Sequence, residues 1–175
     1  MKNRELFSKD PLGWQLLNEG VTSNNATDEK TLRYELQTFV CEGEYQSGLV
    51  RILQGFLSNL GKDQKAVWVS GFYGSGKSHL VKVLRYLWSN VPFEDGTTPR
   101  SLANLPDEIT ELLKELSNKA KQSGAGLISV GGTLRSGAGA VRLRLLGILF
   151  NCLGLPEKIS PAKLWLDLRD EGSLE

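Results

Sequence analysis

The stretch Ala66-Val67-Trp68-Val69-Ser70-Gly71-Phe72-Tyr73-Gly74-Ser75-Gly76-Lys77-Ser78 sets our expectation for the fold of this chain. Its last eight residues match the phosphate-binding pattern G-x-x-x-x-G-K-[ST], which this composition would produce by chance only about 0.02 times. Residues 66–70 are a short apolar run between turn-forming residues, which predicts a buried parallel strand. Apolar residues at helical spacing follow the motif and predict a helix. Together these features predict a strand–loop–helix unit whose loop binds nucleotide phosphates.

Each residue type in the motif has a chemical reason. The glycines let the backbone wrap closely and turn successive N–H groups inward, and a helix starting near Lys77 adds its own unpaired N–H groups. The Lys77 ammonium is expected to reach the β- and γ-phosphates of ATP, and the Ser78 hydroxyl is expected to bind Mg²⁺. The candidate cofactor-binding residues in the loop are therefore Gly71, Gly74, Ser75, Gly76, Lys77 and Ser78, with Ser78 as the metal ligand.

Two alternatives to this interpretation concern the motif and its neighbour. The whole motif could be a glycine-rich turn with an accidental lysine, although all four fixed positions match. His79, the only histidine in the chain, could reach a γ-phosphate and is included among the cofactor-binding candidates. A lone histidine at this place is more often a packing or helix-surface residue, and we favour that interpretation.

The remaining apolar pattern predicts an α/β protein. Residues 127–130 are a second apolar run and predict a second buried strand. Alternating helices and parallel strands indicate a P-loop NTPase of AAA-like type with a parallel sheet core. We expect residues 1–60 to form a helical lead-in segment and residues 61–175 to form the N-terminal part of the NTPase domain. Helices are expected at about 28–37, 49–60, 77–88, 106–120, 141–152 and 160–172.

The acid that hydrolysis requires is missing from the expected place. In this class, a carboxylate at the end of a second strand holds Mg²⁺ and positions water. Residues 127–130 are followed by Gly131-Gly132-Thr133, which carries none. Residues 164–171 contain acids, but Ser160-Pro161 predicts a helix start before them. No catalytic residue can be assigned, and we expect this chain to be the start of a longer ATPase, inactive in hydrolysis by itself.

Composition and charge indicate which class of protein this is and in which compartment we expect it. The chain has 175 residues, 40% of them hydrophobic, and a formal net charge of +1, which is typical of a globular domain and gives no whole-chain argument for nucleic acid. No apolar stretch is long enough for a membrane span, and the start lacks the apolar run of a secretory signal. Two scattered cysteines, Cys41 and Cys152, suggest reduced thiols in the cytoplasm.

The segment before the loop resembles the lead-in of AAA-type ATPases. It consists of Phe39-Val40-Cys41-Glu42-Gly43-Glu44-Tyr45 and a following helix. In those proteins a short extended segment and the next helix contact the base. The resemblance implies that Val40, Cys41 and Tyr45 lie on the adenine side. That they are packing residues of a corner is an equally good interpretation.

Larger parts of the chain resemble the large ATPases of the BREX and phage-growth-limitation type of bacterial phage defence. The similarity rests on Phe39-Val40-Cys41-Glu42-Gly43, residues 67–80, Leu102-Ala103-Asn104-Leu105-Pro106 and Leu164-Trp165-Leu166. It spans nearly the whole chain but only the start of such proteins. The resemblance implies an ATP-driven, cytoplasmic component that associates with itself and with other subunits of a defence complex. DNA contact is possible for the longer protein but has no support in these residues.

Two other functions stay open. The first is a non-catalytic nucleotide-binding module whose helices dock other subunits. The second is a small-molecule kinase, which would need a lid with arginines, whereas residues 89–105 carry only Arg100. Arg135, Arg142 and Arg144 are interpreted as a solvated face, with a subunit or DNA contact as the alternative.

Overall fold

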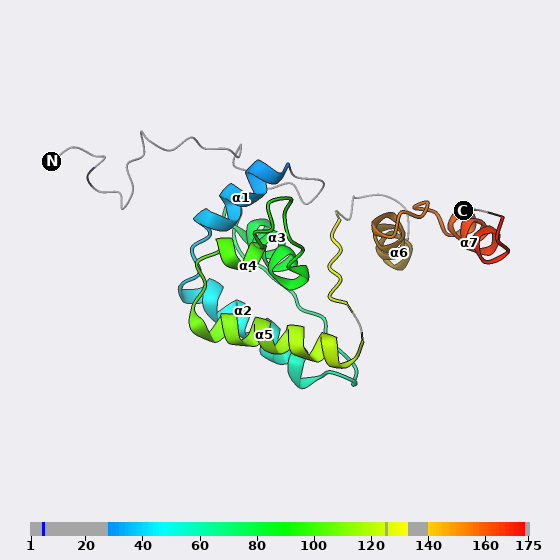
Figure 1. Cartoon of the computed structure of the whole chain (residues 1–175). Helices are drawn as coiled ribbons and strands as arrows, with labels where there is room; N and C mark the ends of the chain where they lie inside the picture. Colours follow the sequence, from blue (N-terminus) through cyan, green and yellow to red (C-terminus); the bar gives the residue numbers. More distant parts are fainter. Residues whose placement is uncertain (1–4, 6–27, 125, 133–139, 174–175) are drawn as a thin grey trace.

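The computed structural model describes residues 5, 28–124, 126–132 and 140–173, and over these ranges it is helical (Figure 1). The described part holds seven α-helices and no β-strand. The helices are α1 (Glu29–Thr38), α2 (Gly43–Ser58), α3 (Lys77–Ser89), α4 (Pro99–Leu102), α5 (Asp107–Gln122), α6 (Val141–Cys152) and α7 (Ile159–Asp170).

The prediction of an α/β, AAA-like P-loop NTPase with a parallel sheet core is therefore wrong for the described ranges. Residues 66–70 and 127–130 are extended, but neither pairs with another described segment. Trp68 is 90% exposed and Ile128 is 67% exposed, so neither run is buried as expected. A strand needs a neighbour about 4.8 Å away to accept and donate its backbone hydrogen bonds. An apolar run indicates suitability for a strand, but it does not show that such a neighbour exists.

The helix predictions are confirmed, with shifted ends. Helix α1 begins after Asp28, whose Oδ1 accepts a 2.7 Å hydrogen bond from the backbone N–H of Thr31. Asp28 is therefore the N-cap, because its carboxylate satisfies a first-turn donor and suits the positive helix end, and the helix begins at Glu29, one residue later than expected. Helix α2 begins at Gly43, six residues before the apolar periodicity that predicted it. The predicted helix over the acidic residues 164–171 is confirmed as α7.

Helices α1 to α5 share one apolar core. Helix α2 lies along α5, α1 packs against α4, and α4 also packs against α3 (Figure 1). The α1 and α2 helices of the predicted lead-in therefore contact helices beyond residue 60, and a division of the chain at residue 60 stays a prediction. The fully buried apolar side chains of this core are Leu36, Leu49, Leu53, Val83, Leu87, Ile109, Leu113 and Leu116.

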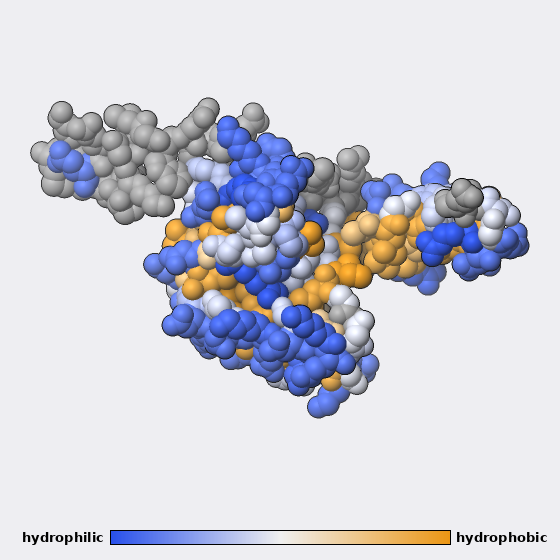
Figure 2. Space-filling model, viewed as in Figure 1, coloured by the Kyte–Doolittle hydropathy of each residue, from blue (hydrophilic) through white to orange (hydrophobic). Residues whose placement is uncertain are grey.

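The apolar residues of α6 are much less covered than those of the core. Val141, Leu145 and Leu149 are 61%, 55% and 40% exposed, and apolar surface is visible over this helix in Figure 2. Helix α6 packs against α7, and Arg144 of α6 lies 3.9 Å from Glu157 in the connection between the two helices. No helix in the described ranges has the length and hydrophobicity needed to cross a bilayer.

Candidate functional site

The glycine-rich loop leads directly into the amino end of α3. Gly76 is the N-cap residue with φ of +76°, and Gly74 has φ of +79°. Both values lie in the left-handed region, which glycine adopts without steric cost. No side chain caps the first turn of α3. The first backbone N–H groups of the helix, together with the positive end of its dipole, therefore face the loop without a side-chain acceptor.

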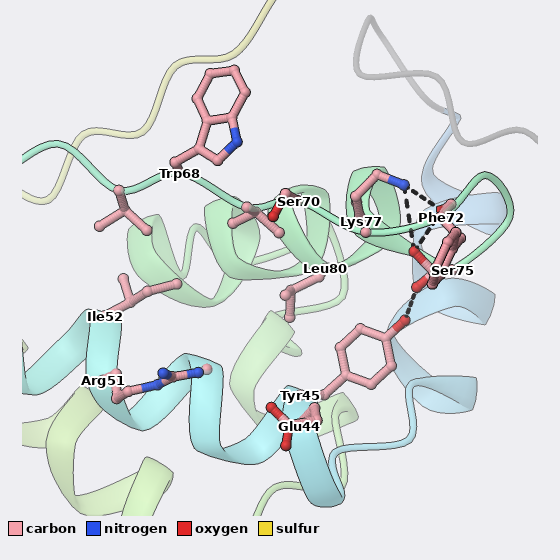
Figure 3. Close-up of a pocket in the computed structure, with 14 residues that line it drawn as sticks. Glu44, Tyr45, Arg51, Ile52, Trp68, Ser70, Phe72, Ser75, Lys77 and Leu80 are labelled. Carbon is pink, nitrogen blue, oxygen red and sulfur yellow. Dashed lines mark hydrogen bonds between the residues drawn. The ribbon is translucent and has the colours of Figure 1, made fainter.

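Lys77 places its ammonium group over this loop. It is the first residue of α3, and its Nζ donates to the Phe72 carbonyl at 2.5 Å and lies 3.4 Å from Ser75 Oγ (Figure 3). The loop is also closed on itself, because the Ser75 backbone N–H and hydroxyl both donate to the Phe72 carbonyl, at 3.2 and 2.8 Å. The positive charge is thus fixed beside the open helix end by groups of the loop itself.

Tyr45 connects the loop to α2. Its hydroxyl donates to the Ser75 carbonyl (Figure 3), and a Cβ atom built on Gly76 would collide with that hydroxyl. Gly76 is therefore needed for close approach as well as for its backbone angle. The AAA-type resemblance had suggested the adenine side for Tyr45, and in the structure this side chain holds the predicted phosphate loop.

Ser78 and the two aromatic residues of the loop face outward. Ser78 is exposed on the first turn of α3. Phe72 and Tyr73 are 90% and 96% exposed. The side chain of Ser78 is therefore accessible to solvent, and the two exposed rings lie in the loop that precedes α3.

His79 packs into the protein behind the loop. Its ring stacks on Phe39, with centroids 5.7 Å apart and planes 30° apart. Burial lowers the pKa of His79; the charge of Glu35 opposes this to a smaller extent, and the charge of Lys82 adds to the lowering. This placement agrees with the packing interpretation, since a neutral half-buried ring against Phe39 contributes contact area rather than charge.

A buried ion pair holds the middle of α3. Lys82 Nζ lies 2.6 Å from Glu35 Oε2 of α1, and both side chains are at most 2% exposed. Each charge is out of water, so each depends on the other. The pair therefore fixes α3, and with it the loop, against α1.

Val40 and Cys41 lie apart from the loop residues. They line a second cavity of about 600 Å³ together with Phe39, Gln46 and residues 104–106. Val40 is 64% exposed, and Cys41 is buried, which raises the pKa of its thiol. The structure does not bring these two residues together with the loop, and their role on the adenine side stays a prediction.

A cavity of about 630 Å³ lies beside the loop, between α2 and residues 67–72. Gly71, Ser75 and Lys77 of the predicted site line it. Sequence reasoning missed the α2 side of this cavity, formed by Glu44, Gly48, Arg51 and Ile52. The spacing of these four residues places them on one face of a helix, and this could be read from the sequence. The spacing does not show which segment of the chain lies opposite that face.

Neither a metal-binding cluster nor a second site formed by the arginines is seen in the described ranges. His, Cys, Asp and Glu residues form no group of three or more that could hold a metal ion within them. Arg135 lies outside the described residues, and Arg144 is near Glu157. No protein-family model matches this chain, and no solved structure matches it. The resemblance to phage-defence ATPases therefore stays a proposal.

Proposed function

We propose that the loop 71–78, at the amino end of α3, binds the polyphosphate of Mg-ATP. The observation that carries this proposal is the uncapped first turn of α3 beside the Lys77 ammonium. Backbone N–H groups, a helix dipole and a fixed cation all favour an anion at the same place. The proposal depends on this local arrangement and requires no sheet.

The groups at the loop also fit Mg²⁺ as the counterion. Mg²⁺ in nucleotide sites takes one or two protein oxygens and fills its remaining positions with phosphate oxygens and water. The exposed Ser78 hydroxyl supplies one such oxygen at the first turn of α3. Ser78 would hold the metal, which would neutralise the phosphates, while Lys77 and the loop amides would hold the phosphate oxygens.

The wider role follows the sequence resemblance. We propose that the chain is the ATP-binding part of an ATPase in an anti-phage defence complex, in contact with other subunits and with copies of itself. The loop supplies binding groups, and no residue in the chain has been assigned to activate water. Binding with little turnover is therefore the expected behaviour of this chain by itself.

A second candidate function is a non-catalytic nucleotide-binding module. It is favoured by the exposed rings of Phe72 and Tyr73 at the loop tip, because aromatic side chains are enriched where proteins bind partners. In this case nucleotide would order the tip for a partner. An arginine-rich kinase lid has less support, because Arg100 donates to the Leu87 carbonyl at 2.6 Å and is not available to a substrate.

Calorimetric titration with Mg-ATP tests the proposed function. Lys77→Ala should weaken binding about 10- to 100-fold, since it removes one charge-assisted contact. Lys62→Ala is the matched control, because it removes the same charge from an exposed turn outside the loop and should leave the affinity unchanged. Equal affinities for wild type and Lys77→Ala would rule out this loop as the phosphate site.

A further inference from the structure

We propose that α6 is a surface for self-association, on which the α6 helix of a second copy of this chain packs antiparallel about a two-fold axis level with Gly147. This inference rests on the self-association in the proposed function and names the surface that would carry it. The surface is separate from the phosphate loop, because none of the residues that line the cavity beside that loop belongs to α6.

The first argument is an apolar stripe along α6. Val141, Leu145, Leu149 and Leu153 follow one another at intervals of four residues and are 61%, 55%, 40% and 55% exposed. Residues four apart lie on one side of a helix, so these side chains form a continuous ridge. Figure 2 shows apolar surface over this helix. Covering such a ridge is favourable, and a contiguous exposed apolar patch is typical of a protein interface.

The second argument is the symmetry of the stripe. Its four members are spaced evenly about residue 147, with Leu145 and Leu149 inside and Val141 and Leu153 outside. In an antiparallel pair centred there, Leu145 of one copy lies level with Leu149 of the other, and Val141 lies level with Leu153. A two-fold interface requires a surface that is complementary to itself. The stripe meets this requirement with residues of this chain alone.

The third argument is the charge at the two ends of α6. Arg142 lies in the first turn, where the helix dipole disfavours a cation, and the last turn holds no basic residue. Arg142 is exposed and forms no ion pair with another described residue, whereas Arg144 lies near Glu157. An antiparallel copy brings each Arg142 beside the carboxyl end of the other α6, where a cation is stabilising. A parallel copy would instead bring the two Arg142 side chains together.

Sedimentation velocity of the whole chain over a range of concentrations tests the proposal. Wild type should be a reversible dimer with an affinity in the micromolar range, because one pair of helices buries less surface than a stable dimer usually does. Leu145→Glu should weaken the dimer at least about 30-fold, since it places two charges in an apolar seam. Leu145 is largely exposed, so the change leaves the core of the chain intact.

The matched control is Leu143→Glu, which makes the same change on the same helix. Leu143 is 45% exposed and lies roughly 160° around α6 from Leu145, so this variant should keep the dimer. Circular dichroism of both variants checks that they remain helical. Titration of Leu145→Glu with Mg-ATP separates the surface from the phosphate loop, and the affinity should equal that of wild type.

A change at Arg142 tests the antiparallel order. Arg142→Ala should weaken the dimer about 3- to 5-fold, because two equivalent contacts with helix ends are lost. An unchanged or tighter dimer in this variant would overturn the antiparallel order, since a parallel pair is relieved of repulsion by the same change.

Three further outcomes would overturn the inference. A dimer retained in Leu145→Glu would show that the copies associate through another surface. A wild type that stays monomeric at every concentration would overturn both this surface and the proposed self-association, while Mg-ATP binding by that monomer would still support the phosphate loop. Binding of a monomeric wild type to anionic phospholipid vesicles would assign the stripe to a lipid surface instead.

Discussion

The two ends of α3 are bonded in opposite ways. At the carboxyl end, Arg100 donates to the Leu87 and Trp88 carbonyls at 2.6 and 3.2 Å, and the Asn90 N–H donates to the Tyr86 carbonyl at 2.8 Å. At the amino end, Gly76 has no side chain and nothing caps the first turn. Helix ends normally need such partners. The comparison teaches that α3 is held by its middle and its carboxyl end, which leaves its amino end open for a ligand.

The largest expected effect comes from breaking the anchor in the middle of α3. Lys82→Met leaves Glu35 charged and buried without its partner, which should cost about 3–5 kcal/mol of unfolding free energy. Urea denaturation measures the loss. The double variant Glu35→Leu with Lys82→Met should recover most of it, because two apolar groups replace the pair. A loss below about 1 kcal/mol in Lys82→Met would show that the pair does not hold the helix.

Arg100 tests the anchored carboxyl end directly. Its guanidinium also donates to the Leu113 carbonyl and to Ser117 Oγ, at 2.9 and 2.7 Å, which joins α3 to α5. Arg100→Ala should cost about 2–4 kcal/mol, because several buried carbonyls lose a charged donor. Arg142→Ala, an exposed arginine on α6, is the control and should stay within about 0.5 kcal/mol. Wild-type urea resistance in Arg100→Ala would contradict the anchoring role.

A substitution at Gly74 tests the backbone conformation of the loop at the open amino end of α3. Its Cβ space is free, so Gly74→Ala adds only the strain of a left-handed backbone, about 1–2 kcal/mol. Thermal unfolding should show this loss, together with weaker binding of Mg-ATP. The matched change Gly55→Ala lies within α2 and should instead stabilise the protein by about 0.5–1 kcal/mol. Equal melting temperatures for the two variants would show that the loop angle observed at Gly74 is not maintained.

The smallest expected effect is a pH dependence at His79. Burial lowers the pKa of His79, so the unfolded chain takes up this proton at a higher pH than the folded chain does. The stabilising contribution is therefore complete above pH of about 6.5 and declines as the pH falls below it. His79 is the only histidine. In His79→Gln, the midpoint of urea denaturation should therefore change less between pH 7.5 and 5.5 than it does in the wild type. An unchanged slope in that variant would assign the dependence to other groups.

The helices could be predicted from the sequence because their signal is local. Residues such as Leu49, Leu53 and Leu57 repeat at helical spacing, and a helix satisfies its own backbone hydrogen bonds. The runs 66–70 and 127–130 were misassigned because a strand depends on a neighbour that the run itself does not encode.

The candidate site likewise has one part that could be predicted from local sequence and one part that could not. The loop Gly71–Ser78 was found because its chemistry lies in eight consecutive residues. The α2 side of the cavity was missed, because the approach of residues 67–71 to Gly48 and Ile52 is a tertiary contact between separate segments. Periodicity shows that 48 and 52 share a helix face but does not show what covers it.

Backbone amide NMR during a titration with Mg-ATP tests the central claim most directly. The account predicts that the largest chemical-shift changes fall on the amides of residues 76–78, because these residues form the uncapped amino end of α3. Amides near Asn90 and Arg100 at the anchored end should change little. Largest changes outside residues 71–78, or no changes at saturating nucleotide, would contradict it.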